Sequence, residues 1–246
     1  MRKSKDIPAK ASMERPTPQQ RKKINASLFD ALALGKHDEF LDALAAGADV
    51  EARNAVGEKP LELAAQQGDA RAIAALIQAG ADVDAVTGSG WSASMLCAQE
   101  GAAEGLRLLL DAGADPLLQI NYGGCALSIA VDFDRRACID ELIRRRAGLD
   151  LRNAKGHSAA WRAVESLDWR SLAALAAAGA DFGGRDSHGQ SLGERFDDLY
   201  GIMEGDPRLA LCRRVLAEDK AAREAKAIAE HVQGASNAPA KAPRTL

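Results

Sequence analysis

Aromatic side chains are scarce in this 246-residue sequence: three Trp, two Tyr and five Phe make up 4% of it, although 47% of the residues are hydrophobic. The apolar content therefore comes mainly from Ala, Leu, Ile and Val. A core built of such small side chains favours helices that approach one another closely. With 27% charged residues, the chain is neither collagen-like nor wholly disordered.

The sequence also lacks a long hydrophobic run. No stretch approaches the ~18 consecutive apolar residues that a membrane-spanning helix needs. Residues 1–24 contain no apolar segment of the kind found in a secretory signal. They carry eight Lys or Arg against two acidic residues, a net charge of +6. We therefore expect a cytoplasmic protein that has no membrane partner.

Motifs for metal binding are missing as well. The histidines never fall at i and i+4, and the cysteines are 28, 13 and 74 residues apart, so no C-x-x-C pair exists. We interpret the cysteines as small core residues and expect no metal or other cofactor. The four cysteines are Cys97, Cys125, Cys138 and Cys212.

What the sequence does contain is a repeat of 33 residues, seen in three independent markers. A glycine returns at Gly57, Gly90, Gly123, Gly156 and Gly189. Gly-Ala-Asp begins at Gly47, Gly80, Gly113 and Gly179, and Arg146-Ala147-Gly148 occupies the missing place. An apolar residue returns at Phe40, Ile73, Leu106, Ile139 and Leu172. A fixed period of this length predicts a stack of repeated structural units.

Residues 54–86 show what one unit should look like. Gly57 suits a turn with positive φ, and Pro60 suits the first position of a short helix. Gly68 breaks that helix, a second helix follows, and Gly80 ends it in the left-handed conformation. Neither helix can bury its apolar face alone, so neighbouring units must stack. The predicted fold is all-α, an α-solenoid of helix-turn-helix units.

This unit resembles the ankyrin repeat, whose pattern is roughly D-x-x-G-x-T-P-L-H-x-A-A-x-x-G followed by x-L-L-x-x-G-A-D. The resemblance covers residues 21–216 and implies about six repeats, of which the terminal ones are degenerate caps. We expect a basic disordered arm at 1–20, a helical extension at 217–232 and a disordered tail at 233–246. The repeats are 21–53, 54–86, 87–119, 120–152, 153–185 and 186–216.

The chain departs from this pattern in two ways. No unit has the full Thr-Pro-Leu-His string; residues 59–62, for example, are Lys-Pro-Leu-Glu. Since these residues normally cap and cross-link repeats, we expect the same fold with lower stability. Arg146 replaces the glycine that normally ends a second helix, so it should adopt the left-handed conformation at a cost of about 1 kcal/mol.

The resemblance implies a non-enzymatic interaction module, an adaptor or regulator that binds another protein through the concave face of the stack. It implies a monomer without a small-molecule substrate. The turn tips and the exposed sides of the first helices should contact the partner. Transferred by position, the binding residues are Trp91, Tyr122, Phe133, His157, Glu165 and Gln190.

Three of these residues are aromatic, in positions that are normally polar. We interpret Trp91, Tyr122 and Phe133 as the centre of the binding surface, because Trp and Tyr are enriched in such centres. In the alternative interpretation, Phe133 is half-buried and Trp91 only covers a turn. Trp161 and Trp169 should instead pack between repeats.

Two other functions stay open at this point. The basic arm offers association with nucleic acid or an acidic surface, although the overall net charge of −3 favours neither. Residues 189–193 match G-x-S-x-G, with Asp186 and His188 nearby, which would make Ser191 the nucleophile of a hydrolase. However, Gly189 is the turn glycine of the repeat. Ser191 aligns with serines of other units at the start of a helix, where a hydroxyl caps free N–H groups.

Overall fold

The fold was obtained as a computed structural model, which describes residues 17–121, 123–203 and 205–236. Within these residues it contains twelve helices and no β-strand, only two isolated bridges between turn residues. The predicted all-α solenoid of helix-turn-helix units is confirmed.

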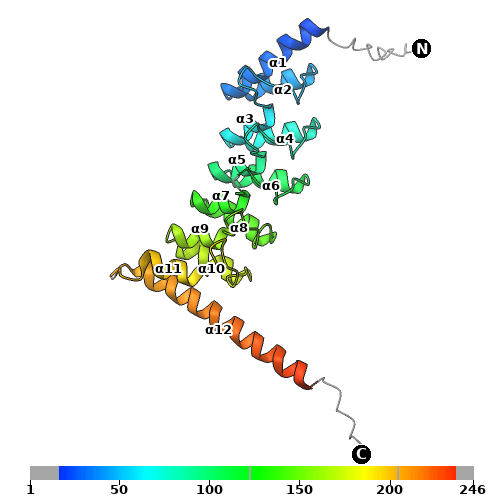
Figure 1. Ribbon diagram of the computed structural model, residues 1–246. Helices are drawn as coiled ribbons and strands as arrows, with labels where there is room; N and C mark the ends of the chain where they lie inside the picture. Colours follow the sequence, from blue (N-terminus) through cyan, green and yellow to red (C-terminus); the bar gives the residue numbers. More distant parts are fainter. Residues whose placement is uncertain (1–16, 122, 204, 237–246) are drawn as a thin grey trace, which may run out of the picture.

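The helices form two parallel rows (Figure 1). Each first helix packs on the first helix of the next unit, and each second helix on the next second helix. The first helices are α1 (Pro18–Ala33), α3 (Pro60–Gln67), α5 (Ala93–Glu100), α7 (Ala126–Asp132), α9 (Ala159–Glu165) and α11 (Leu192–Tyr200). The second helices are α2 (His37–Ala45), α4 (Ala70–Gln78), α6 (Ala103–Asp111), α8 (Arg136–Arg144), α10 (Trp169–Ala177) and α12 (Pro207–Ser236).

The helix boundaries of the second unit have local causes. The carboxylate of Glu62 accepts the Lys59 N–H at 3.0 Å at the start of α3, and Gly68 ends this helix with φ 67°. Asp69 then accepts the N–H groups of the first turn of α4, two bonds of 3.0 Å. Gly80 follows α4 with φ 87°. These residues supply the terminal hydrogen bonds that short helices cannot make internally.

The core lies between the two rows and includes the apolar residues that mark the repeat. Phe40, Ile73, Leu106, Ile139 and Leu172 are all fully buried. All four cysteines are buried and unpaired, which confirms their interpretation as core residues. Burial raises the pKa of the Cys97 thiol to about 12, so the group stays protonated and unreactive.

Hydrogen bonds also connect successive units at the start of their turns. A side chain of one unit accepts a backbone N–H of the next, with distances between 2.6 and 2.8 Å. The acceptor and donor residues are Glu51 and Asp82, Asp84 and Asp115, and Asp150 and Asp181. Leu117, 50% exposed, occupies the acceptor position of the remaining unit, so this series of bonds is interrupted once.

The ends of the array differ from the expected boundaries. Helix α1 begins at Pro18 because Thr17 and Gln20 form a capping box, so residues 18–20 of the expected disordered arm are helical. At the other end α12 is one continuous helix that covers the expected extension and also residues 233–236. It continues the second row by packing on α10 and then leaves the stack (Figure 1). The rest of the arm and the tail lie outside the described residues.

Among the described residues, three other than glycine have positive φ, and each follows a helix. Arg146 has φ 54° after α8, as predicted. Asp134 and Leu167, with φ 51° and 55°, follow α7 and α9 in the same way. The equivalent residues after α3 and α5 are Gly68 and Gly101. The fourth and fifth units therefore carry left-handed strain that the earlier units avoid.

Replacing Arg146 with glycine is expected to raise the free energy of unfolding by about 1 kcal/mol, since glycine adopts this conformation without steric strain. Arg146 is exposed, so the change removes no buried contact. Urea unfolding followed by circular dichroism measures the effect. Arg144→Gly, inside the last turn of α8, is the control and should lower stability by about 1 kcal/mol. A destabilised Arg146→Gly variant would contradict the interpretation that the backbone of Arg146 is strained.

Candidate protein-binding surface

The exposed side of the first helices carries a regular set of side chains. In the second, fifth and sixth units, the residue two positions before the helix contacts the residue eight positions later, near the other end of the helix. Gln66 Nε2 donates to Glu58 Oε1 at 3.2 Å, and Gln190 donates to Asp198 in the same way. We name this set the inner row: Glu58, Gln66, Trp91, Gln99, Asp132, His157, Glu165, Gln190 and Asp198.

Trp91 takes the first of these positions in the third unit. Its backbone N–H donates to Thr87 Oγ1 at 3.0 Å, and its backbone carbonyl accepts the Thr87 N–H at 2.9 Å. The ring packs against the core and is partly buried. Trp91 thus covers its turn and also presents part of its ring at the surface.

The structure separates Trp91 from Phe133. Trp91 precedes α5, whereas Phe133 follows the last residue of the neighbouring helix α7 and is 45% exposed. A helix of this length spans about 10 Å, so the two residues lie at opposite ends of two neighbouring first helices. Tyr122, the third predicted aromatic residue, lies outside the described residues.

His157, Glu165 and Gln190 come together around Asp186. The Asp186 carboxylate lies 3.8 Å from His157 Nε2 and accepts the Gln190 N–H at 2.8 Å. His157 Nδ1 is 4.0 Å from Glu165 Oε1, and its ring stacks on buried Trp161 with centroids 4.6 Å apart. Burial lowers the pKa of His157 and outweighs the two carboxylates, so the imidazole is neutral near pH 7.

The repeat geometry agrees with a sequence comparison. Residues 28–120 match the family model of ankyrin repeats, in three copies. This part of the chain consists of ankyrin repeats. A search of curated proteins found no match. The two rows of helices continue through α10 with the same packing, so the ankyrin architecture extends beyond the matched residues.

Two arginines give the last ankyrin units a charged inner face. Arg195 Nη2 lies 3.0 Å from Glu165 Oε1, and Arg162 lies 3.7 Å from Asp132 and 3.8 Å from Glu165. The sequence interpretation missed both, although the 33-residue register aligns them with Leu63 and with other apolar residues of earlier units. At this one position of the repeat, the side chain therefore changes from apolar to charged along the stack.

Ser191 has a structural role at the start of α11. Its Oγ accepts the Glu194 N–H at 3.3 Å, and the Glu194 carboxylate accepts the Ser191 N–H at 2.7 Å. This capping box confirms the predicted helix cap. His188 is instead directed to Asp186, 3.5 Å away, and its side chain is 82% exposed.

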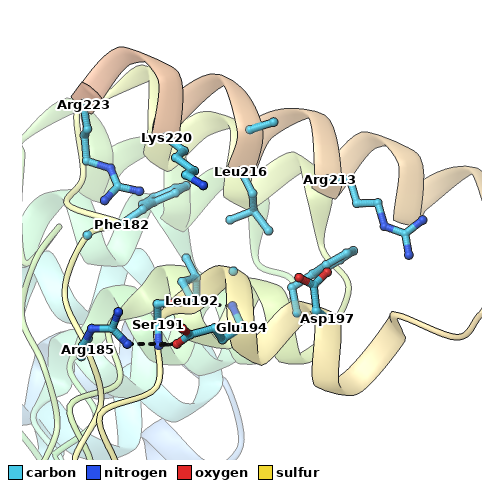
Figure 2. Close-up of a pocket in the computed structure, with 14 residues that line it drawn as sticks. Phe182, Arg185, Ser191, Leu192, Glu194, Asp197, Arg213, Leu216, Lys220 and Arg223 are labelled. Carbon is cyan, nitrogen blue, oxygen red and sulfur yellow. Dashed lines mark hydrogen bonds and ion pairs between the residues drawn. The ribbon is translucent and has the colours of Figure 1, made fainter. Parts of the chain in front are cut away.

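A hollow of about 510 Å³ separates α11 from α12 beside this cap (Figure 2). Phe182, Leu192 and Leu216 supply its apolar side. Lys220 and Arg223 extend from α12 toward it, whereas Glu194 is already occupied by its bonds to Ser191 and Arg185.

No helix of the described ranges is long and apolar enough to cross a membrane.

Proposed function

We propose that this ankyrin protein is a non-enzymatic cytoplasmic adaptor or regulator that binds another protein through its inner row. The inner row is the concave side of the stack in ankyrin proteins. The observation that carries the proposal is the contrast between a constant framework and variable side chains. The core positions repeat with little change, whereas the position before the first helix holds Glu58, Trp91, His157 or Gln190 in different units. Stacking alone does not require this variety.

Trp91 and the charged side chains around Glu165 offer two different kinds of contact on this surface. A partly exposed indole suits a buried apolar anchor, since truncating such a residue commonly costs 2 kcal/mol or more of binding energy. The Asp132, Glu165, Arg162 and Arg195 group suits complementary charges, which set specificity and association rate. A partner that spans units 3–6 would use both.

A site-specific photo-cross-linker tests the proposal in the native source. We place it at Gln99, on the inner row, and at Arg71 or Glu104 on exposed positions of the second helices. Gln99 should form an adduct with a discrete partner, and the other two positions should not. Adducts confined to the second helices, or equal at all positions, would reject the inner row.

The identified partner then allows a binding measurement with matched variants. Trp91→Ala should weaken its affinity about 30-fold, the equivalent of 2 kcal/mol. Trp169→Ala, at the start of α10 in the second row and also partly buried, should change affinity less than threefold. Equal losses in both variants would mean that Trp91 acts through stability alone.

A further inference from the structure

A second recess lies at the opposite end of the stack, between α1 and the turn of the second unit at residues 53–56. Its volume is about 1020 Å³. Helix α1 has 16 residues, whereas the other first helices have seven to nine. In the 33-residue register its residues 21–24 occupy the place of a turn, so a helix stands where the other units have a turn tip. The recess is the space between this helix and the first true turn. We name it the α1 groove.

The floor of the α1 groove is apolar. It is lined by Ala26, Phe29 and Ala33 of α1, by Val56 of the turn and by Leu63 of α3. Val56 is 77% exposed, and Phe29 is only partly buried. An apolar surface of this kind, bounded by polar residues, is typical of a site for a partner side chain.

The rim of the α1 groove is basic. Arg21, Lys22 and Arg53 line it together with a single acidic residue, Asp30. Arg53 is held in place by a 2.6 Å hydrogen bond to the Gly57 carbonyl. This positive rim contrasts with residues 25–216, which carry 19 basic and 29 acidic side chains. The rim therefore favours an acidic ligand, although the body of the chain is acidic.

We propose that the α1 groove docks an acidic amphipathic segment of a partner protein. Apolar side chains of the segment enter between Phe29 and Val56, and its carboxylates meet Arg21, Lys22 and Arg53. This inference rests on the proposed function, because it assigns a partner chemistry to the first units of the same face. Residues 1–16 of the chain carry five basic and two acidic side chains, so their charge opposes the rim. A nucleic acid would match the rim and leave the apolar floor unfilled.

Fluorescence anisotropy with the full chain tests this site. The probe is a fluorescein-labelled 18-residue peptide of Leu, Ala and Glu, with Leu on one helical face, and its twin has Lys in place of every Glu. The Glu peptide should bind, and its affinity should fall as salt rises. The Lys twin should bind at least tenfold more weakly.

Two groove variants and two matched controls locate the binding. Val56→Asp places a carboxylate on the floor, and Arg21→Glu with Lys22→Glu reverses the rim; each should weaken the Glu peptide at least tenfold. Ser89→Asp changes the same turn position of the next unit, and Arg71→Glu reverses an exposed charge on α4. These controls should alter affinity less than twofold. All five substituted residues are on the surface, and circular dichroism verifies the fold.

Several results would contradict the proposal that the α1 groove docks an acidic segment. These are binding of neither peptide, equal binding of both, unchanged affinity in Val56→Asp, or tighter binding of a labelled single-stranded oligonucleotide. Such a result with the Gln99 adduct still present would reject the groove and leave the proposed function standing. Peptide binding that persists without any inner-row adduct would reject the proposed function instead.

Discussion

Replacing Trp161 with alanine is expected to lower the free energy of unfolding by about 3 to 5 kcal/mol, the typical cost of removing a large aromatic side chain from a core. Trp161 is only 1% exposed and lies in the middle of α9. This helix packs on both α7 and α11, so the cavity would open between three consecutive units. The stacked ring of His157 would lose its support as well. Urea unfolding followed by circular dichroism at several wavelengths measures the loss.

Trp169→Ala is the matched control for this change. Trp169 also belongs to the fifth unit, but it is partly buried and its ring lies beneath the exposed Arg170 guanidinium, 5.5 Å from the centroid. We expect less than half the destabilisation of Trp161→Ala. Equal losses would show that exposure does not separate the two tryptophans, and a Trp161→Ala loss below ~1 kcal/mol would contradict its place in the core.

The repeat could be predicted from the sequence because its determinants are local. Gly57, Gly80 and Ser191 act through φ preferences and caps that depend on a few neighbouring residues, and each has the predicted role. Arg146 was predictable for the same reason, by comparison with the glycines at the equivalent position. Stacking then follows from the period alone, since short amphipathic helices must bury their apolar faces.

The arrangement of the binding surface was harder to predict. Trp91 and Phe133 are close in unit number, which suggested a cluster, but the register already places them nine positions apart within the repeat. The arginine contacts of Glu165 had a weaker signal. The contact of Glu165 with Arg195 joins side chains 30 residues apart, so its formation depends on rotamers and on the exact spacing of the units.

The α1 groove could not be predicted from the sequence either. A turn was missing from the first unit in the sequence, where Ile24 takes the place of the turn glycine. That absence indicates a cap but does not reveal that helix α1 continues through the gap. The extension depends on the capping box of Thr17 and Gln20, whose residues precede the recognisable repeat. The groove exists because a straight helix and a turn tip do not pack against each other as two turn tips do.

Asp168→Ala is expected to have the second large effect, a loss of about 2 to 4 kcal/mol. Asp168 caps α10 by accepting the Ser171 N–H at 3.2 Å, and a lost cap typically costs about 1 kcal/mol. It also accepts two hydrogen bonds, of 2.6 and 2.7 Å, from Arg136 Nη2 of the preceding unit. Hydrogen bonds between charged groups contribute about 1.5 to 3 kcal/mol, and the Asp168 side chain is only 15% exposed, so water screens this pair weakly.

Asp69→Ala separates the two contributions. Asp69 is the equivalent residue three units earlier and caps α4 with two hydrogen bonds, but it forms no ion pair among the described residues. Its replacement should cost only the cap, about 1 kcal/mol. The excess loss in Asp168→Ala then measures the contact with Arg136 between units. Equal losses in the two variants would show that this contact adds no stability.

The pH dependence gives an independent measure of the same contact. Burial acts to raise the pKa of Asp168, but hydrogen bonds from Ser171 and Arg136 outweigh it, and the net pKa lies below the usual value. The unfolded chain therefore takes up the proton first as the pH falls. The stability contributed by this carboxylate is complete above the unfolded pKa of about 3.9 and is lost as the pH falls through the lower folded pKa. The difference between wild type and Asp168→Ala should accordingly be constant near neutral pH and shrink below about pH 4. A difference that persists unchanged in strong acid would mean that the ionised carboxylate is not what holds the two units together.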